Sequence, residues 1–389
     1  MTDAQSDSFP ATSPSPASPT ELTVAVVGAG IIGRNHTTAM LRIPRLRIVA
    51  VVDPITSAAT NLAATIPSAP ACYATLAEAL ATAKPQIVVI CTPSGQHVGQ
   101  AMEALAAGAH VVIEKPLDVS VDRARPLLAA ARAATGQVVS VISQHRFDPA
   151  TVAIRSAVDA GRLGRLTSAV ATVPWWRGQD YYDSAGWRGT MALDGGGALM
   201  NQGVHTLDLL LHFLGRPVSV FAYTDRLAHT GIEVEDVLVA VLRFESGALA
   251  TLHATTAAYP GVGVRLQVHG SRGSAVLRDD QLEYAALAEP FSPTGAAASA
   301  EATSPPGSSS AAGTAPTTDL AGVEPYGSPK PADTFIVGHL RQYEDIVDAI
   351  VTGRPPGVGV EDGFLALSVV QAIYESAGSG QPVLIDGVS

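Results

Sequence analysis

Residues 21–143 alternate short apolar runs with helix-like segments, and this alternation is the strongest constraint on the fold. The apolar runs, rich in Val and Ile, are residues 22–28, 46–53, 86–92, 110–114 and 137–143. Runs this short and apolar throughout are typical of strands buried on both faces. The Ala- and Leu-rich segments between them favour helical crossovers. The pattern therefore predicts a doubly wound parallel α/β sheet over residues 21–143.

After residue 143 the pattern changes, because strand-like runs follow one another without helices between them. Helices are expected over residues 148–161 and 195–214, and the strand-like runs are residues 237–244, 248–256, 264–269 and 274–277. Short turn signals such as Glu245-Ser-Gly247 separate these runs, as in antiparallel hairpins. We therefore predict an α+β second domain over residues 144–389, with a large, mostly antiparallel open sheet. It would include a low-complexity excursion over residues 285–333 and final helices within residues 335–376.

Composition limits the class of protein. At about 100–200 residues per domain, the 389 residues fit two domains. The net charge of −11 argues against a nucleic-acid partner. Residues 1–20 contain no Lys or Arg and no apolar stretch of signal-peptide length, so we expect a disordered tail. No segment has the ~18 apolar residues of a membrane span, so we expect a cytoplasmic protein with no membrane partner.

The first strand-like run ends in a glycine-rich turn, Gly28-Ala-Gly30-Ile31-Ile32-Gly33. Gly28 allows a tight turn, Gly30 lets the backbone approach a pyrophosphate, and Gly33 permits close packing of helix on strand. The N-terminus of the following helix offers free N–H groups to phosphates. The alternative is a glycine turn in an α/β domain that binds no nucleotide.

Asp53 ends the second run, 20 positions after Gly33. A carboxylate at this place accepts both ribose hydroxyls of NAD and repels the additional phosphate of NADP. The following residues, Pro54-Ile-Thr56, offer no Arg to hold that phosphate. We therefore expect a Rossmann domain that binds NAD.

Two further segments carry candidate catalytic groups. Glu114-Lys115-Pro116 follows the run 110–114, at the carboxyl edge where ligands of such sheets bind. Residues 194–208 lead from three glycines into a helix in which Asn201, His205 and Asp208 share one face. Three glycines would let backbone and ligand approach closely there.

Histidine suits alcohol oxidation because its pKa lies near neutrality, so His205 is the expected general base. The alternative is a hydrogen-bonded core or surface histidine. A metal site built from His205, Asp208 and His212 is not expected, because no Cys or Glu completes the ligand set.

Residues 174–188 concentrate aromatic and basic side chains and contain all three tryptophans of the chain. Aromatic faces stack on sugar rings, and Arg or Tyr fixes hydroxyls or an anionic group. The substrate-binding candidates are Trp175, Trp176, Arg177, Tyr182 and Arg188, together with Asn201 and with Arg146 from Gln144-His-Arg146. Packing of a loop against the second domain is the alternative for any single aromatic residue.

Four motifs occur in order: the glycine-rich turn, Cys91-Thr92-Pro93-Ser-Gly-Gln-His97, Glu114-Lys-Pro116, and Gly195-Gly-Gly-x-x-x-Asn-x-Gly-x-His205-x-x-Asp208. Together they resemble the glucose–fructose oxidoreductase/inositol dehydrogenase/MocA family. The resemblance covers residues 22–277 and the final helices. It implies a homo-oligomer, a dimer or tetramer, and a carbohydrate substrate. It also implies that Thr92, Pro93, His97, Glu114 and Lys115 lie at the cofactor.

By this resemblance Lys115 and His205 would manage the proton while a ring hydroxyl of a sugar, sugar acid or cyclic polyol is oxidised. Many members have Asp at the position of Asn201, and an amide holds a hydroxyl but takes no proton. The alternative function is an NAD-dependent glycosidase, which oxidises a hydroxyl transiently, eliminates the aglycone, adds water and reduces the product.

Overall fold

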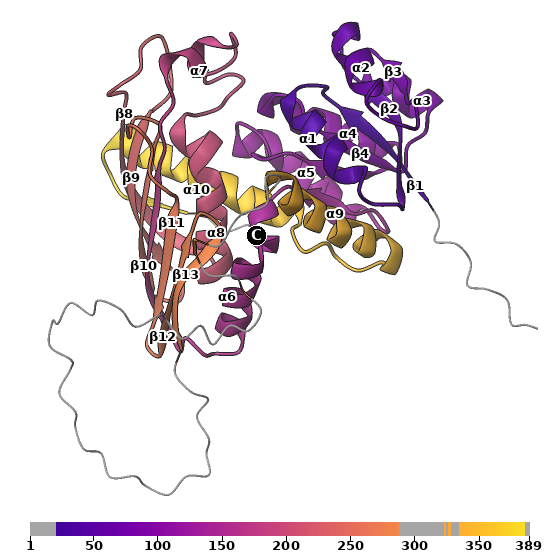
Figure 1. Cartoon of the computed structure of the whole chain (residues 1–389). Coiled ribbons are helices and arrows are strands. Elements are labelled where there is room, and N and C mark those ends of the chain that lie inside the picture. The colour runs from indigo at the N-terminus through magenta and orange to yellow at the C-terminus, as the bar shows by residue number, and fades with distance from the viewer. Residues whose placement is uncertain (1–20, 288–322, 324–325, 328–333, 386–389) are drawn as a thin grey trace, which may run out of the picture.

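The computed structural model describes residues 21–287, 323, 326–327 and 334–385. The predicted tail 1–20 and most of the predicted excursion 285–333 lie outside the described residues. The described chain forms two sheets with helices between and around them, and Figure 1 shows the two sheets side by side. None of the described helices is long and apolar enough to cross a membrane.

The first sheet has six parallel strands in the order β3-β2-β1-β4-β5-β6, which is the doubly wound order of a dinucleotide-binding domain. Its strands are β1 (Leu22–Val27), β2 (Leu46–Val52), β3 (Ala71–Tyr73), β4 (Ile87–Ile90), β5 (His110–Ile113) and β6 (Val139–Val141). The helices that connect them are α1 (Ile31–Met40), α2 (Thr56–Ala63), α3 (Leu76–Thr82), the 3-10 turn η1 (Ser94–Gln96), α4 (His97–Ala106) and α5 (Val121–Ala133). Since β1 and β4 are neighbours, the strand order reverses there, and the glycine-rich turn follows β1 at this point.

The second sheet has eight strands in the order β13-β12-β11-β7-β10-β9-β8-β14. They are β7 (Leu166–Pro174), β8 (Pro217–Asp225), β9 (Val237–Phe244), β10 (Leu249–Thr255), β11 (Arg265–Gly270), β12 (Gly273–Arg278), β13 (Gln281–Leu287) and β14 (Val383–Leu384). Among the described strands of this second sheet, only β7 and β10 pair in parallel. The predicted fold class is therefore confirmed.

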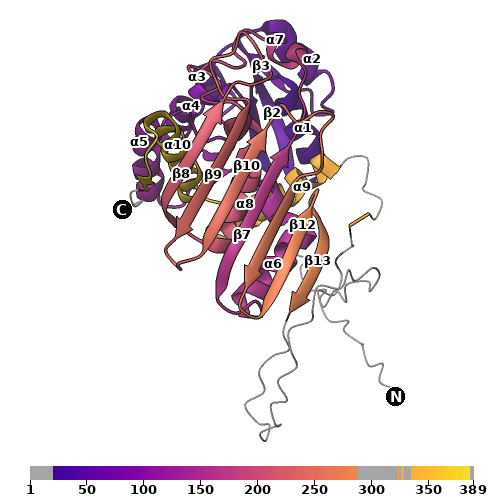
Figure 2. The same ribbon diagram turned by 90° about the vertical axis from the view of Figure 1, so that its left-hand side faces the viewer.

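The remaining helices include those that cover one side of this sheet. They are the 3-10 turn η2 (Gln144–Phe147), α6 (Pro149–Asp159), α7 (Gln179–Asp183), the π-helical turn η3 (Leu199–Gly203), α8 (Val204–Leu214), α9 (Thr334–Thr352) and α10 (Val360–Ser379). Along β9 the residues facing these helices, such as Leu242, are buried, while Val239 and Val241 of the other face are exposed. Figure 2 shows that none of the described helices covers this second face, so the described sheet is open on that side.

Several details differ from the sequence-based prediction. The strand β7, at the centre of the second sheet, was not predicted. The strand β13 continues to Leu287 and so extends into the predicted excursion. The helical stretch expected over 195–214 begins only at Leu199, because the glycines before it form a turn. The helix α9 follows the second sheet in sequence but packs against the first one, with Tyr343 and Ile346 in the same core cluster as Val24.

Candidate active site

The turn between β1 and α1 leaves room for a ligand at one glycine and is filled by protein at the other two. A Cβ atom on Gly28, where φ is +96°, would lie 2.7 Å from the Cys91 carbonyl oxygen, and one on Gly33 would lie 2.0 Å from the Gly28 carbonyl oxygen. A Cβ on Gly30 would have no neighbour within 4 Å. No side chain caps α1, so its first N–H groups point toward this open space. The turn therefore fits a pyrophosphate, as the glycine spacing of residues 28–33 predicts.

Asp53 lies beside this turn, just after β2. Its carboxylate accepts hydrogen bonds from the N–H of Ala29 (2.9 Å) and of Ile55 (2.8 Å). Each oxygen keeps a lone pair for a ribose hydroxyl, because a carboxylate offers about four acceptor positions. Ile31 is exposed at the start of α1 and Ile32 is half-buried beside it. These residues fit the adenosine side of NAD.

His97 connects two loops of the first sheet. Its side chain is buried, with Nδ1 2.8 Å from the Pro116 carbonyl oxygen and Nε2 2.8 Å from the Thr92 carbonyl oxygen. Both partners are carbonyl oxygens, which only accept, so a neutral imidazole donates to one of them. That His97 lies at the cofactor stays a prediction. His97 fixes the loop that carries Thr92 and Pro93 to the loop that carries Lys115. The hydroxyl of Thr92 donates to Gln100 Oε1 (2.7 Å).

Lys115 extends from the end of β5 toward the second domain. Its Nζ donates to the Asn201 carbonyl oxygen at 3.1 Å, so it joins the two domains. Burial lowers the pKa of Lys115, against the opposing effect of the neighbouring Glu114 carboxylate. Burial raises the pKa of Glu114, but hydrogen bonds from His339 and His36 outweigh it and hold that pKa well below its ordinary value. The Lys115 ammonium therefore lies beside a fixed negative charge.

His205 comes from the first turn of α8 and lines the same small cavity as Lys115. Burial lowers the pKa of His205 well below its ordinary value of 6.5, and the positive charges of Lys115 and His145 lower it further. The imidazole is consequently neutral at neutral pH and able to accept a proton. The His145 ring meets it edge-on, with 5.3 Å between ring centroids.

The three glycines before α8 accommodate other parts of the protein. A Cβ on Gly195 would lie 2.7 Å from Val119 Cγ1, one on Gly196 would lie 2.2 Å from the Tyr374 hydroxyl oxygen, and one on Gly197 would lie 1.8 Å from the Glu235 carbonyl oxygen. The Glu235 carboxylate accepts from the N–H groups of Gly197 (2.9 Å) and Leu199 (2.8 Å). The space beside these three Cα atoms is therefore filled by protein, and the approach of a ligand to their backbone stays a prediction.

Arg146 also has a different place from the one expected. Its guanidinium donates to both carboxylate oxygens of Asp208 (2.8 and 2.6 Å) and to Asp362 (2.8 Å). Ser143 Oγ donates to Asp208 as well. All three guanidinium nitrogens are thus engaged by carboxylates, and Arg146 ties η2 to α8 and α10. The shared helical face of Asn201, His205 and Asp208 does not line one cleft as a unit.

A larger cavity of about 350 Å³ lies between α8, η2 and the second sheet. His205 and Gln202 reach it from the helix side, Trp175 and Leu266 from the sheet, and His145 from η2. The strands contribute apolar side chains, while Asp279 and Asp280 of the turn after β12 and Asp148 beside η2 add carboxylates to its lining. Apolar faces together with polar groups suit the faces and hydroxyls of a sugar ring.

The aromatic segment divides between cavity, core and surface. Trp175 lines the cavity, whereas Tyr182 is buried with its hydroxyl 2.7 Å from the Thr256 hydroxyl. Trp176 stacks edge-on against Tyr259 and is 37% exposed. The neighbouring Tyr181 was not among the candidates, yet Arg188 and Gln202 both donate to its hydroxyl oxygen, at 2.9 and 3.2 Å. The Tyr181-Tyr182 pair alone does not indicate which ring turns inward.

The absence of a metal site stays a prediction. Among the described residues, two groups bring potential ligand atoms within 4.8 Å of one another: His36, Glu114 and His339, and His145, Asp148 and Asp280. Neither contains His205 or His212. Both are held by internal hydrogen bonds or ion pairs, for example His36 Nε2 to Glu114 Oε1 at 2.7 Å and His145 Nδ1 to Asp148 Oδ2 at 3.0 Å.

Comparison with known proteins gives matches over both sheets. Residues 22–143 match the description "Oxidoreductase family, NAD-binding Rossmann fold", and residues 151–276 match "GFO/IDH/MocA C-terminal domain". The inositol 2-dehydrogenase of Rhizobium meliloti (strain 1021) is 31% identical over 264 residues, covering 66% of this chain and 75% of that protein. The D-glucoside 3-dehydrogenase of Escherichia coli (strain K12) is 31% identical over 258 residues, covering 61% and 70%. The crystal structure of the WlbA dehydrogenase from Bordetella pertussis in complex with NADH and UDP-GlcNAcA has a TM-score of 0.81 and 28% identity, covering 96% of this chain and 100% of that one.

Proposed function

Because the chain belongs to the GFO/IDH/MocA oxidoreductase family, we propose that it oxidises a ring hydroxyl of a sugar, sugar acid or cyclic polyol, with His205 and Lys115 handling the proton. The matches confirm the predicted family, NAD as the cofactor, and an oxidoreductase of the class that acts on sugars or polyols. NAD supplies the hydride acceptor. The glycine-rich turn and Asp53 would hold its pyrophosphate and ribose.

One observation carries the proposal: Lys115 and His205, from different domains, line one cavity, and Lys115 Nζ is bonded to the backbone of the same helical segment. A neutral imidazole and an ammonium would have different roles in alcohol oxidation. His205 takes the hydroxyl proton, and Lys115 donates a hydrogen bond to the hydroxyl oxygen as negative charge develops on it. Burial of both groups lowers the pKa of each, which keeps His205 in the accepting form.

Asn201 would orient the substrate rather than take a proton. Its side-chain Nδ2 donates to the Gly196 carbonyl oxygen at 3.2 Å, and its amide also interacts with the Asp194 carboxylate. This arrangement leaves His205 as the proton acceptor on α8, since Asn has no basic form at ordinary pH.

The test is incubation of the protein with substoichiometric NAD and a panel of sugars, sugar acids, cyclic polyols and aryl glycosides. Absorbance at 340 nm and aglycone release are followed together. NADH that grows with one substrate class, without aglycone, supports the dehydrogenase. Aglycone release beyond the NAD supplied, without NADH accumulation, contradicts it and supports the glycosidase.

Residue roles are tested with His205→Ala. We expect kcat to fall about 10²- to 10⁴-fold, the usual contribution of a general base, while NADH affinity measured by fluorescence changes little. The matched control is His253→Ala, on the open face of β10. Unchanged kcat in His205→Ala would contradict the assignment.

A further inference from the structure

Two arginine side chains beside the cavity have no carboxylate partner within ion-pair distance among the described residues. They are Arg177, just before α7, and Arg188, just after it, and the Nε atom of each is buried without a hydrogen-bond partner. Arg146, by contrast, is bonded to two carboxylates. Arg188 does donate from Nη1 to the Tyr181 hydroxyl oxygen. A buried N–H without an acceptor still costs free energy, so two guanidinium groups without a carboxylate partner in an acidic protein require an explanation.

Aromatic rings hold both guanidinium groups in place. Both contact Tyr181, with the Arg188 Cζ atom 4.5 Å and the Arg177 Cζ atom 5.2 Å from its ring centroid. Trp175 lies 5.1 Å from Arg177 Cζ, and Trp187 lies 4.6 Å from Arg188 Cζ. Contact with ring faces fixes a guanidinium plane while its N–H groups remain directed outward along its edge.

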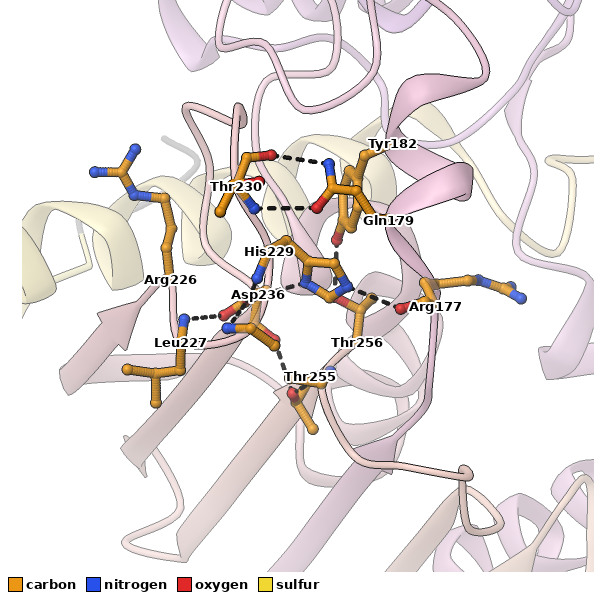
Figure 3. A network of polar contacts seen from close by, with 12 residues as sticks. Arg177, Gln179, Tyr182, Arg226, Leu227, His229, Thr230, Asp236, Thr255 and Thr256 are labelled. Carbon is orange, nitrogen blue, oxygen red and sulfur yellow. Dashed lines mark hydrogen bonds and ion pairs between the residues drawn. The ribbon is translucent and has the colours of Figure 1, made fainter.

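A separate polar network anchors the main chain at Arg177 (Figure 3). The His229 ring lies between the Asp236 carboxylate, 2.8 Å from Nδ1, and the Arg177 carbonyl oxygen, 2.8 Å from Nε2. The Arg177 N–H donates to the Thr256 carbonyl oxygen at 2.9 Å. Figure 3 shows the Arg177 side chain pointing away from this network. The backbone is thus fixed independently of the guanidinium, whose position serves another purpose.

The two arginines are linked to the cavity that His205 lines. Trp175, in contact with Arg177, lines that cavity, and so does Gln202, which donates to the Tyr181 hydroxyl oxygen. The Asp194 carboxylate interacts electrostatically with Arg188, but it also accepts from the Gly189 N–H at 2.8 Å and interacts with Asn201. Asp194 is therefore already engaged by its own segment.

We propose that Arg177 and Arg188 form an anion-binding subsite, so that the substrate is a sugar carrying a carboxylate or a phosphate group. This inference rests on the proposed function and specifies its substrate class. The forked donors of a guanidinium match the paired oxygens of either group, and both arginines contact the same ring, Tyr181. The anion would occupy the subsite beside Tyr181 while the sugar ring lies between Trp175 and His205.

The test compares four probes by isothermal titration into protein saturated with NADH and into cofactor-free protein. UDP-GlcNAcA carries a diphosphate and a carboxylate, UDP-GlcNAc a diphosphate alone, glucuronic acid a carboxylate alone, and glucose neither. We expect at least one anionic probe to bind more than tenfold tighter than glucose. Equal affinity for the two UDP sugars would show that the subsite binds the diphosphate. Weaker binding of UDP-GlcNAc than of UDP-GlcNAcA would show that it binds the carboxylate.

Arg177→Gln and Arg188→Gln should each weaken the preferred anionic probe by about 10- to 100-fold, the effect of losing a charge-assisted bond. NADH affinity and the melting temperature should stay unchanged. Arg188→Lys keeps the charge but loses the forked pair of donors. Its affinity for the anionic probe should therefore lie between those of the wild type and Arg188→Gln. Arg132→Gln removes an exposed arginine of α5 paired with Glu361 and serves as the control for net charge.

The proposal is wrong if neither Gln variant weakens the anionic probes, or if no anionic probe binds more tightly than glucose. NAD reduction by a neutral sugar in that case would leave the proposed dehydrogenase intact. Failure of the protein to bind NADH would contradict the proposed function instead. The titrations without cofactor would then still decide whether the two arginines bind anions.

Discussion

The two glycine-rich turns of the chain look alike in sequence but have opposite roles in the structure. In the first turn Gly30 has no neighbour within 4 Å of a Cβ position, so a ligand has room there. In the second turn, residues 195–197, every glycine is met by protein atoms closer than 3 Å. The first turn admits a cofactor, and the second lets two parts of one domain pack without a gap.

The difference shows that a glycine cluster predicts close approach to the backbone, but does not indicate whether a ligand or another part of the protein approaches. The partners of the first turn follow from its place between a strand and a helix. The partners of the second come from distant parts of the chain: Glu235 lies 38 positions beyond Gly197, and Tyr374 belongs to α10. No local sequence pattern predicts contacts between residues so far apart along the chain.

The largest effect is expected for Gly197→Ala. Its Cβ would lie 1.8 Å from the Glu235 carbonyl oxygen, and a backbone atom cannot swing aside as a side chain can. We expect a loss of about 3–4 kcal/mol in the free energy of unfolding, at the upper end of overpacking effects. Urea denaturation measures it, and NADH affinity of the folded protein should stay unchanged.

The matched control is Gly186→Ala, where a Cβ would meet no atom within 4 Å. Its unfolding free energy should stay within ~0.5 kcal/mol of the wild type. Equal stability of the two variants would show that the second turn is open after all.

Gly33→Ala should lower the stability, as a substitution in the second turn does, and also weaken NADH binding, as expected for the first turn. Its Cβ would lie 2.0 Å from the Gly28 carbonyl oxygen, so the phosphate-binding turn itself must shift. We expect a loss of about 2–3 kcal/mol in unfolding free energy and a weakening of NADH binding, measured by urea denaturation and fluorescence titration. Gly99→Ala in α4, where nothing lies within 4 Å, is the control and should be neutral or slightly stabilising. Normal NADH affinity in Gly33→Ala would contradict the packing role of this glycine.

The same contrast explains which parts of the molecule could be predicted. Both sheets follow from local periodicity: apolar runs with helices between them in the first, successive hairpins in the second. Lys115 and His205 could be found because strand ends and helical spacing are local properties. Arg146 could not be placed, since its partners Asp208 and Asp362 are brought near only by folding. Nor could β7, whose parallel neighbour β10 lies far along the chain.

Glu235 makes the second turn sensitive to pH in a way that the first is not expected to be. Burial raises its pKa to about 7, against the lowering effect of the Leu199 and Gly197 N–H groups. The folded protein then binds a proton more tightly than the unfolded chain, where the ordinary pKa is 4.5. This contribution to stability is full below pH 4.5 and is lost as the pH rises through about 7.

Glu235→Gln should therefore remove a pH-dependent contribution of about 2 kcal/mol between pH 5 and pH 8. Urea denaturation at pH 5 and at pH 8 gives the change in unfolding free energy with pH. The difference in this change between variant and wild type measures the contribution of Glu235. Glu103→Gln, on the exposed face of α4, should keep the wild-type change with pH. A wild-type change with pH in Glu235→Gln would mean that the carboxyl group under the second turn does not titrate in this range.

The smallest effect, and the one that separates the turns most directly, is expected for Gly30→Ala. The φ angle of −72° suits alanine and no atom lies near the new Cβ, so the unfolding free energy should fall by no more than about 1 kcal/mol, the cost of alanine at an N-cap. The methyl group would instead occupy space proposed for the pyrophosphate, so the Kd for NADH should rise about tenfold, or about 1.4 kcal/mol. Fluorescence titration measures this. If Gly30→Ala binds NADH as the wild type does, the open space at the first turn is not where the phosphates lie, and the two turns no longer differ in what their glycines admit.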